Sequence, residues 1–309
     1  AYAHTRRDAS ILTGQKIFIQ GSPALDDCYG IRTGRMSGIS YHLVPWFLKS
    51  FQSPSYEANT TPVWERKLKR IAAETKTQNM RIVAGIPPWV MMYFDEIMDQ
   101  TGKKSMSEVF PNLSLYIHGG VHFDPYRAML MEKIGKNIDT LDTYTASEGF
   151  FGFQEIADEK AMTLCCNNGI FYEFVPVEEI QAAAPTRLTL EEAEIGRDYA
   201  LVLNTLSGLW GYLIGDTIRF VQKNPWRFVI TGRVAEYTSL FGEHVIEQEV
   251  RKAMEEVCAK FKVRTRYFTV APLLMAGQGL SHHQWWIEFE HAPADMTPLE
   301  AHIDEAMCR

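Results

Sequence analysis

The chain has 309 residues, of which 46% are hydrophobic and 22% are charged. This length and composition predict a globular protein with one large core, or with a large core and a small second domain. The formal net charge is −7 at pH 7. Because the sequence has no basic stripe, we expect neither nucleic acid nor a membrane surface as a partner. An anionic ligand would have to be held by a local site.

The sequence has no apolar run long enough to span a bilayer and no apolar signal region near its start, so a cytoplasmic location is expected. Its five cysteines lack Cys-x-x-Cys spacing, which indicates reduced thiols rather than a zinc site or a disulfide framework. The chain begins without Met and ends within a helical pattern over Leu299–Arg309. We therefore expect a fragment of a longer protein.

Short apolar runs alternate with helical patterns through the first half of the chain, which is typical of strand–helix–strand units and a largely parallel sheet. The expected strands are Lys16–Ile19, Arg81–Ile86, Leu113–Ile117 and Ile138–Thr143. Helices are expected to begin at Pro62, Pro88 and Pro125, because Pro is favoured in the first turn. The first of these helices has an apolar face formed by Trp64, Leu68, Ile71 and Ala72. Its charged run, Glu65–Arg70, is interpreted as a solvated face.

After Glu148 the pattern changes to that of an antiparallel sheet. Asn168-Gly169 lies between the apolar runs Met162–Leu164 and Ile170–Val175, which predicts a two-residue hairpin. Further strands are expected at Tyr199–Leu203, Tyr212–Val221 and Trp226–Thr231.

The last part of the chain predicts a small α+β unit. A helix is indicated by apolar residues spaced by four, four and three, namely Ile246, Val250, Met254 and Val257. Strands are expected at Arg264–Val270 and Gln284–Phe289, and a domain boundary near Gly232–Ala235. The expected fold is thus α/β, with a large domain of mixed sheets flanked by helices over residues 1–232 and a smaller α+β domain over residues 233–309.

A glycine pair, Gly119-Gly120, follows the third predicted strand and precedes Val121. Glycines at the carboxyl end of a strand let a flat ligand approach the backbone closely. The alternative is a plain turn into the helix at Pro125.

A second set of polar groups follows the next strand, in the run Tyr144-Thr145-Ala146-Ser147-Glu148. The tyrosine ring can stack on a purine, the serine hydroxyl can donate to an α-phosphate, and the carboxylate can hold Mg²⁺ against phosphate oxygens. Taken singly, Glu148 would more often be a solvated acid and Tyr144 a core residue.

Two further candidates lie downstream. Asp216 follows a glycine at a strand bend, where it can accept from both hydroxyls of a ribose. Arg233 follows Gly232. A Gly-Asp pair is also common in plain turns.

The order of these motifs resembles the luciferase-type adenylate-forming superfamily. The motifs are Tyr144–Glu148, Tyr212–Asp216 and Gly232-Arg233, with Gly242, Val245 and Glu249-Val250 downstream. Other segments resemble more closely the auxin-responsive-promoter (Gretchen Hagen) acyl acid amido synthetases, and those segments are Tyr144–Gln154, Ile170–Pro176 and Gly208–Trp210. The bacterial branch of that family is resembled by Gly119–Val121 and Ala146–Phe151. The likeness extends from about Lys16 to the end of the chain.

The resemblance implies two steps, in which a small carboxylic acid attacks the α-phosphate of Mg-ATP and an amine or amino acid then displaces AMP from the acyl-adenylate. The implied cofactors are ATP and Mg²⁺. By position, the implied nucleotide-binding residues are Gly119, Gly120, Val121, Tyr144, Thr145, Ala146, Ser147 and Asp216. The implied catalytic residues are Ser147 at the α-phosphate, Glu148 on Mg²⁺, and Arg233 near ribose or phosphate.

Aromatic residues near these motifs are candidates for an acyl-acid pocket. Phe150 and Phe151 directly follow the nucleotide carboxylate, and Trp89 follows the prolines that start the second helix. The same residues would serve equally as core packing. His118 and His122 flank the glycine pair without a third ligand, which favours packing over a metal site.

The chain departs from the family pattern in several places. The Ser/Thr/Gly-rich phosphate loop should lie before Lys16, and the catalytic lysine should lie beyond Arg309, so both domains are expected to be incomplete and the isolated fragment is expected to be inactive. At three positions this chain differs from the residue that is usual in the family. Leu213 stands where plant relatives carry Arg, Ala235 replaces the usual hinge Asp, and Ser239 replaces a usual Lys. An acyl-CoA ligase and a non-catalytic adenylate-binding remnant therefore remain alternatives. The sequence leaves the acid, the amine and the oligomeric state open.

Overall fold

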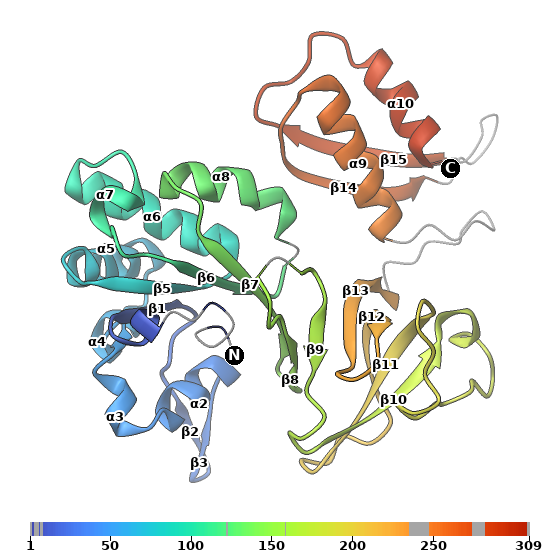
Figure 1. Ribbon diagram of the computed structural model, residues 1–309, viewed down its shortest axis with the longest axis horizontal. Coiled ribbons are helices and arrows are strands. Elements are labelled where there is room, and N and C mark those ends of the chain that lie inside the picture. Colours follow the sequence, from blue (N-terminus) through green and yellow to red (C-terminus); the bar gives the residue numbers. More distant parts are fainter. Residues whose placement is uncertain are drawn as a thin grey trace. The chain divides into compact units, whose positions relative to one another are not determined.

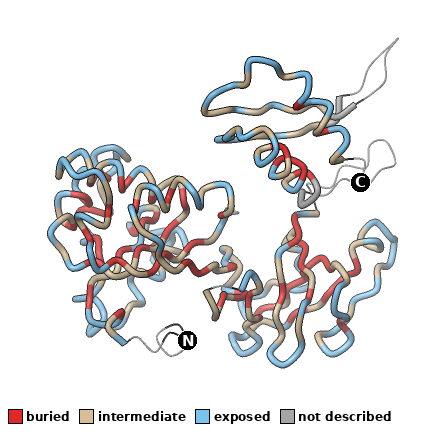
Figure 2. The backbone as a smooth tube through the Cα atoms, turned by 45° about the horizontal axis from the view of Figure 1, so that its top comes forward, coloured by how far each residue is buried: buried red, intermediate tan, exposed pale blue. Residues whose placement is uncertain are grey.

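In a computed structural model the chain forms two compact units, Ala1–Cys165 and Cys166–Arg309. The structure describes residues 2, 6, 9–121, 123–157, 159–234, 247–273 and 282–307. Residues of the sequence analysis that lie outside the described ones are His122, Ala235, Ser239, Gly242, Val245, Ile246 and Cys308. Buried backbone follows the strands and the inner sides of the helices, and the connections are mostly exposed (Figure 2).

The first unit is built on a mixed sheet with the strand order β9-β8-β7-β6-β5-β1-β4 (Figure 1). Its strands are β1 (Gln15–Ile19), β4 (Gln52–Ser53), β5 (Met80–Gly85), β6 (Leu115–Gly119), β7 (Asp139–Ala146), β8 (Gly149–Phe153) and β9 (Met162–Leu164). The strands from β4 to β7 are parallel neighbours, whereas β8 and β9 run antiparallel. The predicted strand–helix–strand organisation and the change to antiparallel strands after Glu148 are both confirmed.

Helices pack on the parallel strands and form the main core with them. The helical segments of the first unit are η1 (Ala9–Leu12), α2 (Met36–Leu43), α3 (Trp46–Lys49), α4 (Tyr56–Asn59), α5 (Trp64–Thr75), α6 (Pro87–Thr101), α7 (Met106–Val109) and α8 (Asp124–Ile134). A separate hairpin pairs β2 (Asp26–Cys28) with β3 (Ile31–Thr33). The branched and aromatic side chains of the core are fully buried, so the hydrophobic effect favours this helix-on-sheet arrangement.

Prolines and glycines set the ends of two long helices, and the prolines were expected at their starts. Both α6 and α8 carry a proline in the first turn, where a missing N–H costs nothing. They end at Gly102 and Gly135, which adopt left-handed backbone conformations with φ of 67° and 77°. The prediction for α5 is wrong by two residues, because this helix begins at Trp64 rather than Pro62.

The interpretation of Glu65–Arg70 as a solvated face is wrong at one position. Lys67 has only 3% of its surface exposed, whereas its charged neighbours are exposed. Lys67 lies three residues after Trp64 and four before Ile71, so helical geometry places it on the apolar face that packs inward.

The second unit begins with the antiparallel strand order β10-β11-β12-β13. These strands are β10 (Ile170–Pro176), β11 (Asp198–Thr205), β12 (Tyr212–Gln222) and β13 (Arg227–Arg233), with the short helix η2 (Val177–Glu179) after β10. The rings of Phe174 and Phe220 meet edge to face at 5.1 Å between centroids, and both are fully buried. All four strands were expected at these positions.

The hairpin predicted at Asn168-Gly169 is wrong. Strand β10 pairs with β11, and β9 pairs with β8, so the two segments flanking this dipeptide are not hairpin partners. Gly169 still adopts a φ of 79°, so the local turn signal is real. The turn at Asn168-Gly169 therefore does not determine which strands pair.

The rest of the second unit contains α9 (Glu247–Phe261), β14 (Thr265–Leu273), β15 (His282–Phe289) and α10 (Thr297–Met307). Strands β14 and β15 pair antiparallel, and the two helices bury Met254, Val257, Leu299 and Ile303. The expected α+β elements are therefore confirmed, while the boundary between residues 232 and 233 stays a prediction. Within the described residues, every helix is too short or too polar to cross a membrane.

Candidate functional site

The candidate residues of the first unit follow the carboxyl ends of parallel strands. Strands β5, β6 and β7 run side by side in one direction, with Gly119 of β6 opposite Thr143 of β7. Parallel neighbours end at the same edge of a sheet, and open α/β sheets bind their ligands at that edge. The glycine pair and the run after β7 therefore share one edge.

Gly119 is needed because β6 and β7 approach each other closely. A Cβ atom at this position would lie 2.4 Å from the carbonyl oxygen of Thr143 and 2.6 Å from its Oγ1. The Thr143 hydroxyl donates to the carbonyl oxygen of His118 at 2.8 Å. Gly120 adopts a φ of 78°, which L side chains rarely adopt, and Val121 is 40% exposed. The pair thus places bare backbone at the edge of the sheet.

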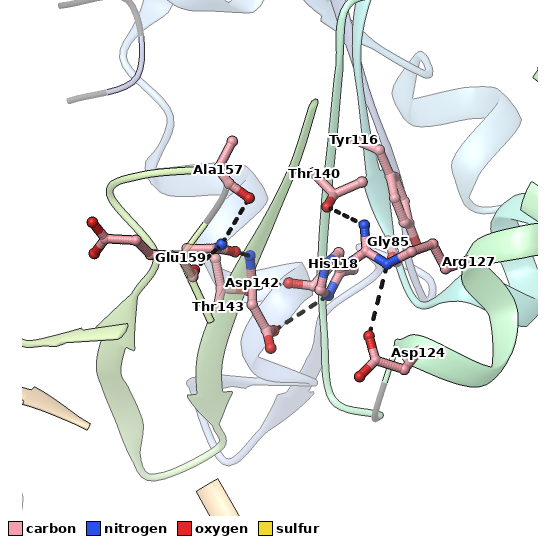
Figure 3. A network of polar contacts seen from close by, with 11 residues as sticks. Gly85, Tyr116, His118, Asp124, Arg127, Thr140, Asp142, Thr143, Ala157 and Glu159 are labelled. Carbon is pink, nitrogen blue, oxygen red and sulfur yellow. Dashed lines mark hydrogen bonds and ion pairs between the residues drawn. The ribbon is translucent and has the colours of Figure 1, made fainter. Parts of the chain in front are cut away.

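A polar and aromatic network holds the segment between β6 and α8 (Figure 3). The ring of His118 is buried and stacks on Phe123, with 4.2 Å between centroids. Its Nδ1 lies 3.3 Å from Oδ1 of Asp142, close enough for an ion pair but without hydrogen-bond geometry. Arg127 covers Phe123 and donates to the hydroxyl of Thr140 at 3.1 Å. These contacts fix the backbone that carries Gly119 and Gly120.

Tyr116 adds a second anchor to this network. Its hydroxyl donates to the carbonyl oxygen of Gly85 at 2.8 Å, which joins β6 to the end of β5. Burial and the nearby Asp142 carboxylate raise the pKa of Tyr116, so it stays a neutral donor.

The run from Tyr144 to Glu148 forms the end of β7 and the turn into β8. Strand β7 continues three residues past its predicted end, and Ala146 pairs with Gly149 across a turn made by Ser147 and Glu148. Ser147 is exposed and Glu148 is half-buried. The hydroxyl and the carboxylate therefore lie at the tip of a two-stranded hairpin.

Tyr144 is mostly buried, with 6% of its surface exposed. Its ring packs against Phe151, with 4.9 Å between centroids. Thr145, the next residue, is exposed, as expected from the alternation of side chains along a strand. The predicted stacking of Tyr144 on adenine stays a prediction.

The three acyl-pocket candidates lie in different surroundings. Phe151 is fully buried, and Trp89 packs at 4.9 Å from Trp64 beside the main core. Phe150 points to the other face of β8 and is 43% exposed. Of the three, Phe150 offers the most surface to a ligand.

Asp216 and Arg233 meet in the second unit as a cross-strand pair of β12 and β13. Arg233 Nε donates to Asp216 Oδ1 at 2.8 Å. The aspartate side chain is 14% exposed and the arginine side chain 55%. Sequence reasoning named both residues but missed their pairing; two strands joined by a tight turn at Asn224-Pro225 were the available signal.

The side chains of the candidate site fit Mg²⁺ only when the ion is also bound to the phosphates of a nucleotide. Among the described residues, no three His, Cys, Asp or Glu side chains are grouped to hold a metal ion. Glu148 alone can supply one carboxylate, and Mg²⁺ bound to phosphates commonly takes one or two carboxylates and several waters. The predicted metal role of Glu148 is compatible with this chemistry.

Comparison with known proteins points to one group of ligases. Residues 163–233 match the model of the GH3 family central domain. Indole-3-acetic acid-amido synthetase GH3.8 of Oryza sativa subsp. indica is 35% identical over 127 residues, which are 38% of this chain and 20% of that protein. The matched segment is thus a minor part of the rice enzyme.

Two solved structures share the fold. The GH3.15 acyl acid amido synthetase has a TM-score of 0.73 at 15% identity, covering 97% of this chain and 64% of its own. O-succinylbenzoate coenzyme A synthetase (MenE) from Bacillus subtilis, in complex with ATP and magnesium ion, has a TM-score of 0.52 at 10% identity, covering 98% and 57%. Residues 163–233 therefore match the GH3 family central domain, part of the chain is similar in sequence to the rice amido synthetase, and the chain shares its fold with the two solved structures.

Proposed function

We propose that this chain belongs to an ATP-dependent acyl acid amido synthetase and carries residues of its nucleotide site. The match of residues 163–233 to the GH3 family central domain is the observation that carries the proposal. The hairpin tip with Ser147 and Glu148 supports it, because it offers a hydroxyl and a carboxylate at the ligand-binding edge of the sheet.

In the first step, an oxygen of the acid's carboxylate forms a bond to the α-phosphorus of ATP, and the bond to pyrophosphate breaks. Most of the catalysis is charge stabilisation and positioning. Ser147 donates to an α-phosphate oxygen, while the backbone of Gly119 and Gly120 and the ring of Tyr144 border the adenine. Magnesium held by Glu148 would neutralise the charge that develops on the phosphate oxygens.

The second unit contributes to nucleotide orientation. Asp216 accepts from the ribose hydroxyls, and its bond to Arg233 holds the carboxylate in place. In the second step, the amine nitrogen attacks the acyl carbon, the bond to AMP breaks, and the nitrogen loses a proton. The product is an amide.

The test is acid-dependent exchange of pyrophosphate into ATP by the purified full-length protein, with a panel of small carboxylic acids. Exchange is expected with at least one acid, followed by amide formation when amino acids are added. Formation of a thioester with coenzyme A instead of an amide would indicate an acyl-CoA ligase. Binding of ATP without exchange for any acid would overturn the catalytic proposal and favour an adenylate-binding remnant.

A further inference from the structure

Lys67 is a buried cation outside the candidate nucleotide site. It lies on α5, is 3% exposed, and donates from Nζ to the carbonyl oxygen of Gln20 at 2.7 Å. The ammonium also lies 5.6 Å from the centre of the Trp64 ring. A buried ammonium is costly unless it is well paired, so its retention calls for a physical reason.

A second cation lies beside the same stretch of backbone. The guanidinium of Arg35 lies against Gly21, where a Cβ atom would be 3.0 Å from one of its nitrogens. Burial and repulsion by Arg35 lower the pKa of Lys67 to about 8. Among the described residues, neither cation forms an ion pair with a carboxylate.

A buried polar group next to these cations is also without a partner. Gln20 is 5% exposed, and its side-chain Oε1 makes no hydrogen bond within the described structure. Buried polar atoms are nearly always satisfied, so this orphaned acceptor indicates a place for a polar ligand that also carries a hydrogen-bond donor. An anion would offset the repulsion between Lys67 and Arg35.

The position of this cluster places it on the ligand-binding edge of the sheet. Gln20 directly follows β1, whose last residue, Ile19, lies opposite Gly85 of the parallel strand β5. Strand β1 is two strands from β6 and three from β7. Neighbouring strands are spaced by about 4.8 Å, so the cluster lies roughly 10 to 15 Å from the loops at Gly119 and Ser147. A nucleotide or an acceptor molecule in the site can span part of that distance.

We propose that Lys67 and Arg35 form an oxyanion-binding subsite for a reactant of the amide-forming reaction. The identity of the ligand rests on the proposed function, whereas the existence of the subsite does not. Two sources of the oxyanion are open to this chemistry, namely the carboxylate of an acceptor amino acid and the phosphate oxygens of pyrophosphate. Both present paired oxygens that an ammonium and a guanidinium bind well.

The test is direct binding of two probes, glycine and inorganic pyrophosphate, to the purified chain. The chain is labelled with ¹³C at lysine Cε, and the Lys67 resonance, identified by its loss in Lys67→Met, is titrated with pH. A bound oxyanion should raise the pKa of Lys67 from about 8 by one unit or more. The probe that does so identifies the source.

Variants separate binding from packing. Arg35→Gln changes an exposed residue, so the variant should fold normally. It should bind about tenfold or more weakly to the probe that raises the pKa of Lys67. Lys67→Met should have the same effect on binding measured by calorimetry. Lys69→Met, the same change on the exposed face of α5, should leave binding unaltered.

The outcomes distinguish this proposal from the proposed function. If neither probe moves the pKa of Lys67, or if Arg35→Gln leaves probe binding unchanged, the subsite does not exist. If a probe binds as expected but no acid supports pyrophosphate exchange, the subsite stands and the amido synthetase proposal fails.

Discussion

Glu148 is half-buried in the turn between β7 and β8, and the proposed metal-binding role of its carboxylate can be tested by substitution. Glu148→Gln is expected to lower Mg-dependent pyrophosphate exchange at least about a hundredfold, because the charge that binds the metal is lost. The free energy of unfolding should change by less than about 0.5 kcal/mol, since the amide has the same shape. Glu191→Gln, at an exposed position, is the control. A large loss of stability in urea would show that Glu148 has a structural role instead.

Asp216 offers a matched pair of tests within one sheet. Asp216→Asn is expected to raise the apparent KM for ATP about tenfold, because the ribose loses a charged acceptor. Asp198→Asn is the control. Asp198 on β11 accepts from Nε and Nη2 of Arg219 on β12 at 2.8 and 2.6 Å, and it has no assigned role in nucleotide binding. Steady-state kinetics with varied ATP would distinguish the two. Equal effects of both variants on KM would contradict the ribose role.

Lys67 predicts an unusual dependence of stability on pH. Its pKa of about 8 in the folded chain is below the ordinary value of 10.5, so the unfolded chain binds the proton more tightly between these pH values. The cost of burying the charge is therefore full below pH 8 and disappears as pH rises towards 10.5. Lys67→Met should be more stable than the parent by about 2 kcal/mol at pH 7, after allowing for the lost bond to Gln20. Urea unfolding at pH 7 and pH 10.5 measures the difference, and a gain that does not shrink at high pH would contradict this account.

At the scale of elements, the contact between β6 and β7 is set by one missing side chain. Gly119→Ala is expected to lower the free energy of unfolding by about 2 kcal/mol, because the new Cβ would lie 2.4 Å from backbone and the strands must separate. Val121→Ala, two residues later and exposed, should stay within about 0.5 kcal/mol. Chemical denaturation of both variants gives the comparison. Equal stability would mean that the strands can separate at no cost.

Much of the element pattern could be predicted from the sequence, because it depends on local signals. Proline in the first turn identified α6 and α8, and apolar runs identified β1 and β5. The partner of β10 could not be predicted, because the Asn168-Gly169 turn acts locally while strand pairing depends on the whole sheet. Short elements such as α3 and β2 carry too few residues for a periodic signal.

The candidate site was predictable in composition but not in arrangement. Residue types identified Ser147 and Glu148, yet β7 had to extend past its predicted end to place them on a hairpin tip. The burial of Tyr144 against Phe151 and the bond between Asp216 and Arg233 depend on strand register, which the sequence specifies only through the packed faces. Lys67 was missed because a charged run suggests solvent, although its helical spacing from Trp64 and Ile71 indicated the buried face.

At the scale of the whole molecule, the residues proposed to bind the nucleotide belong to two compact units. Gly119 to Glu148 belong to the first, and Asp216 and Arg233 to the second. The GH3 family central domain matches residues 163–233, so it lies across the last strand of the first unit and the β10–β13 sheet of the second.

The proposed residue roles predict that Mg-ATP slows hydrogen exchange around each proposed nucleotide residue. At a concentration of one hundred times Kd, ligand binding stabilises the folded state by about 2.7 kcal/mol. Hydrogen exchange measured by mass spectrometry should slow at the β7–β8 turn and at the ends of β12 and β13. With Asp216→Asn, protection of β12 and β13 should weaken at a fixed ATP concentration. Absence of protection at β12 and β13 in the parent chain would contradict the proposed ribose role of Asp216.

The close approach of β6 to β7 has a consequence for altering what this protein accepts. Position 119 admits hydrogen alone, since Thr143 fills the space where any larger group would go. The neighbouring surface is free to vary, because Val121 and Phe150 are both substantially exposed. A mutant library aimed at new substrates should therefore diversify positions 121 and 150 and keep glycine at position 119. Most variants at position 119 would misfold, so their activity could not be selected.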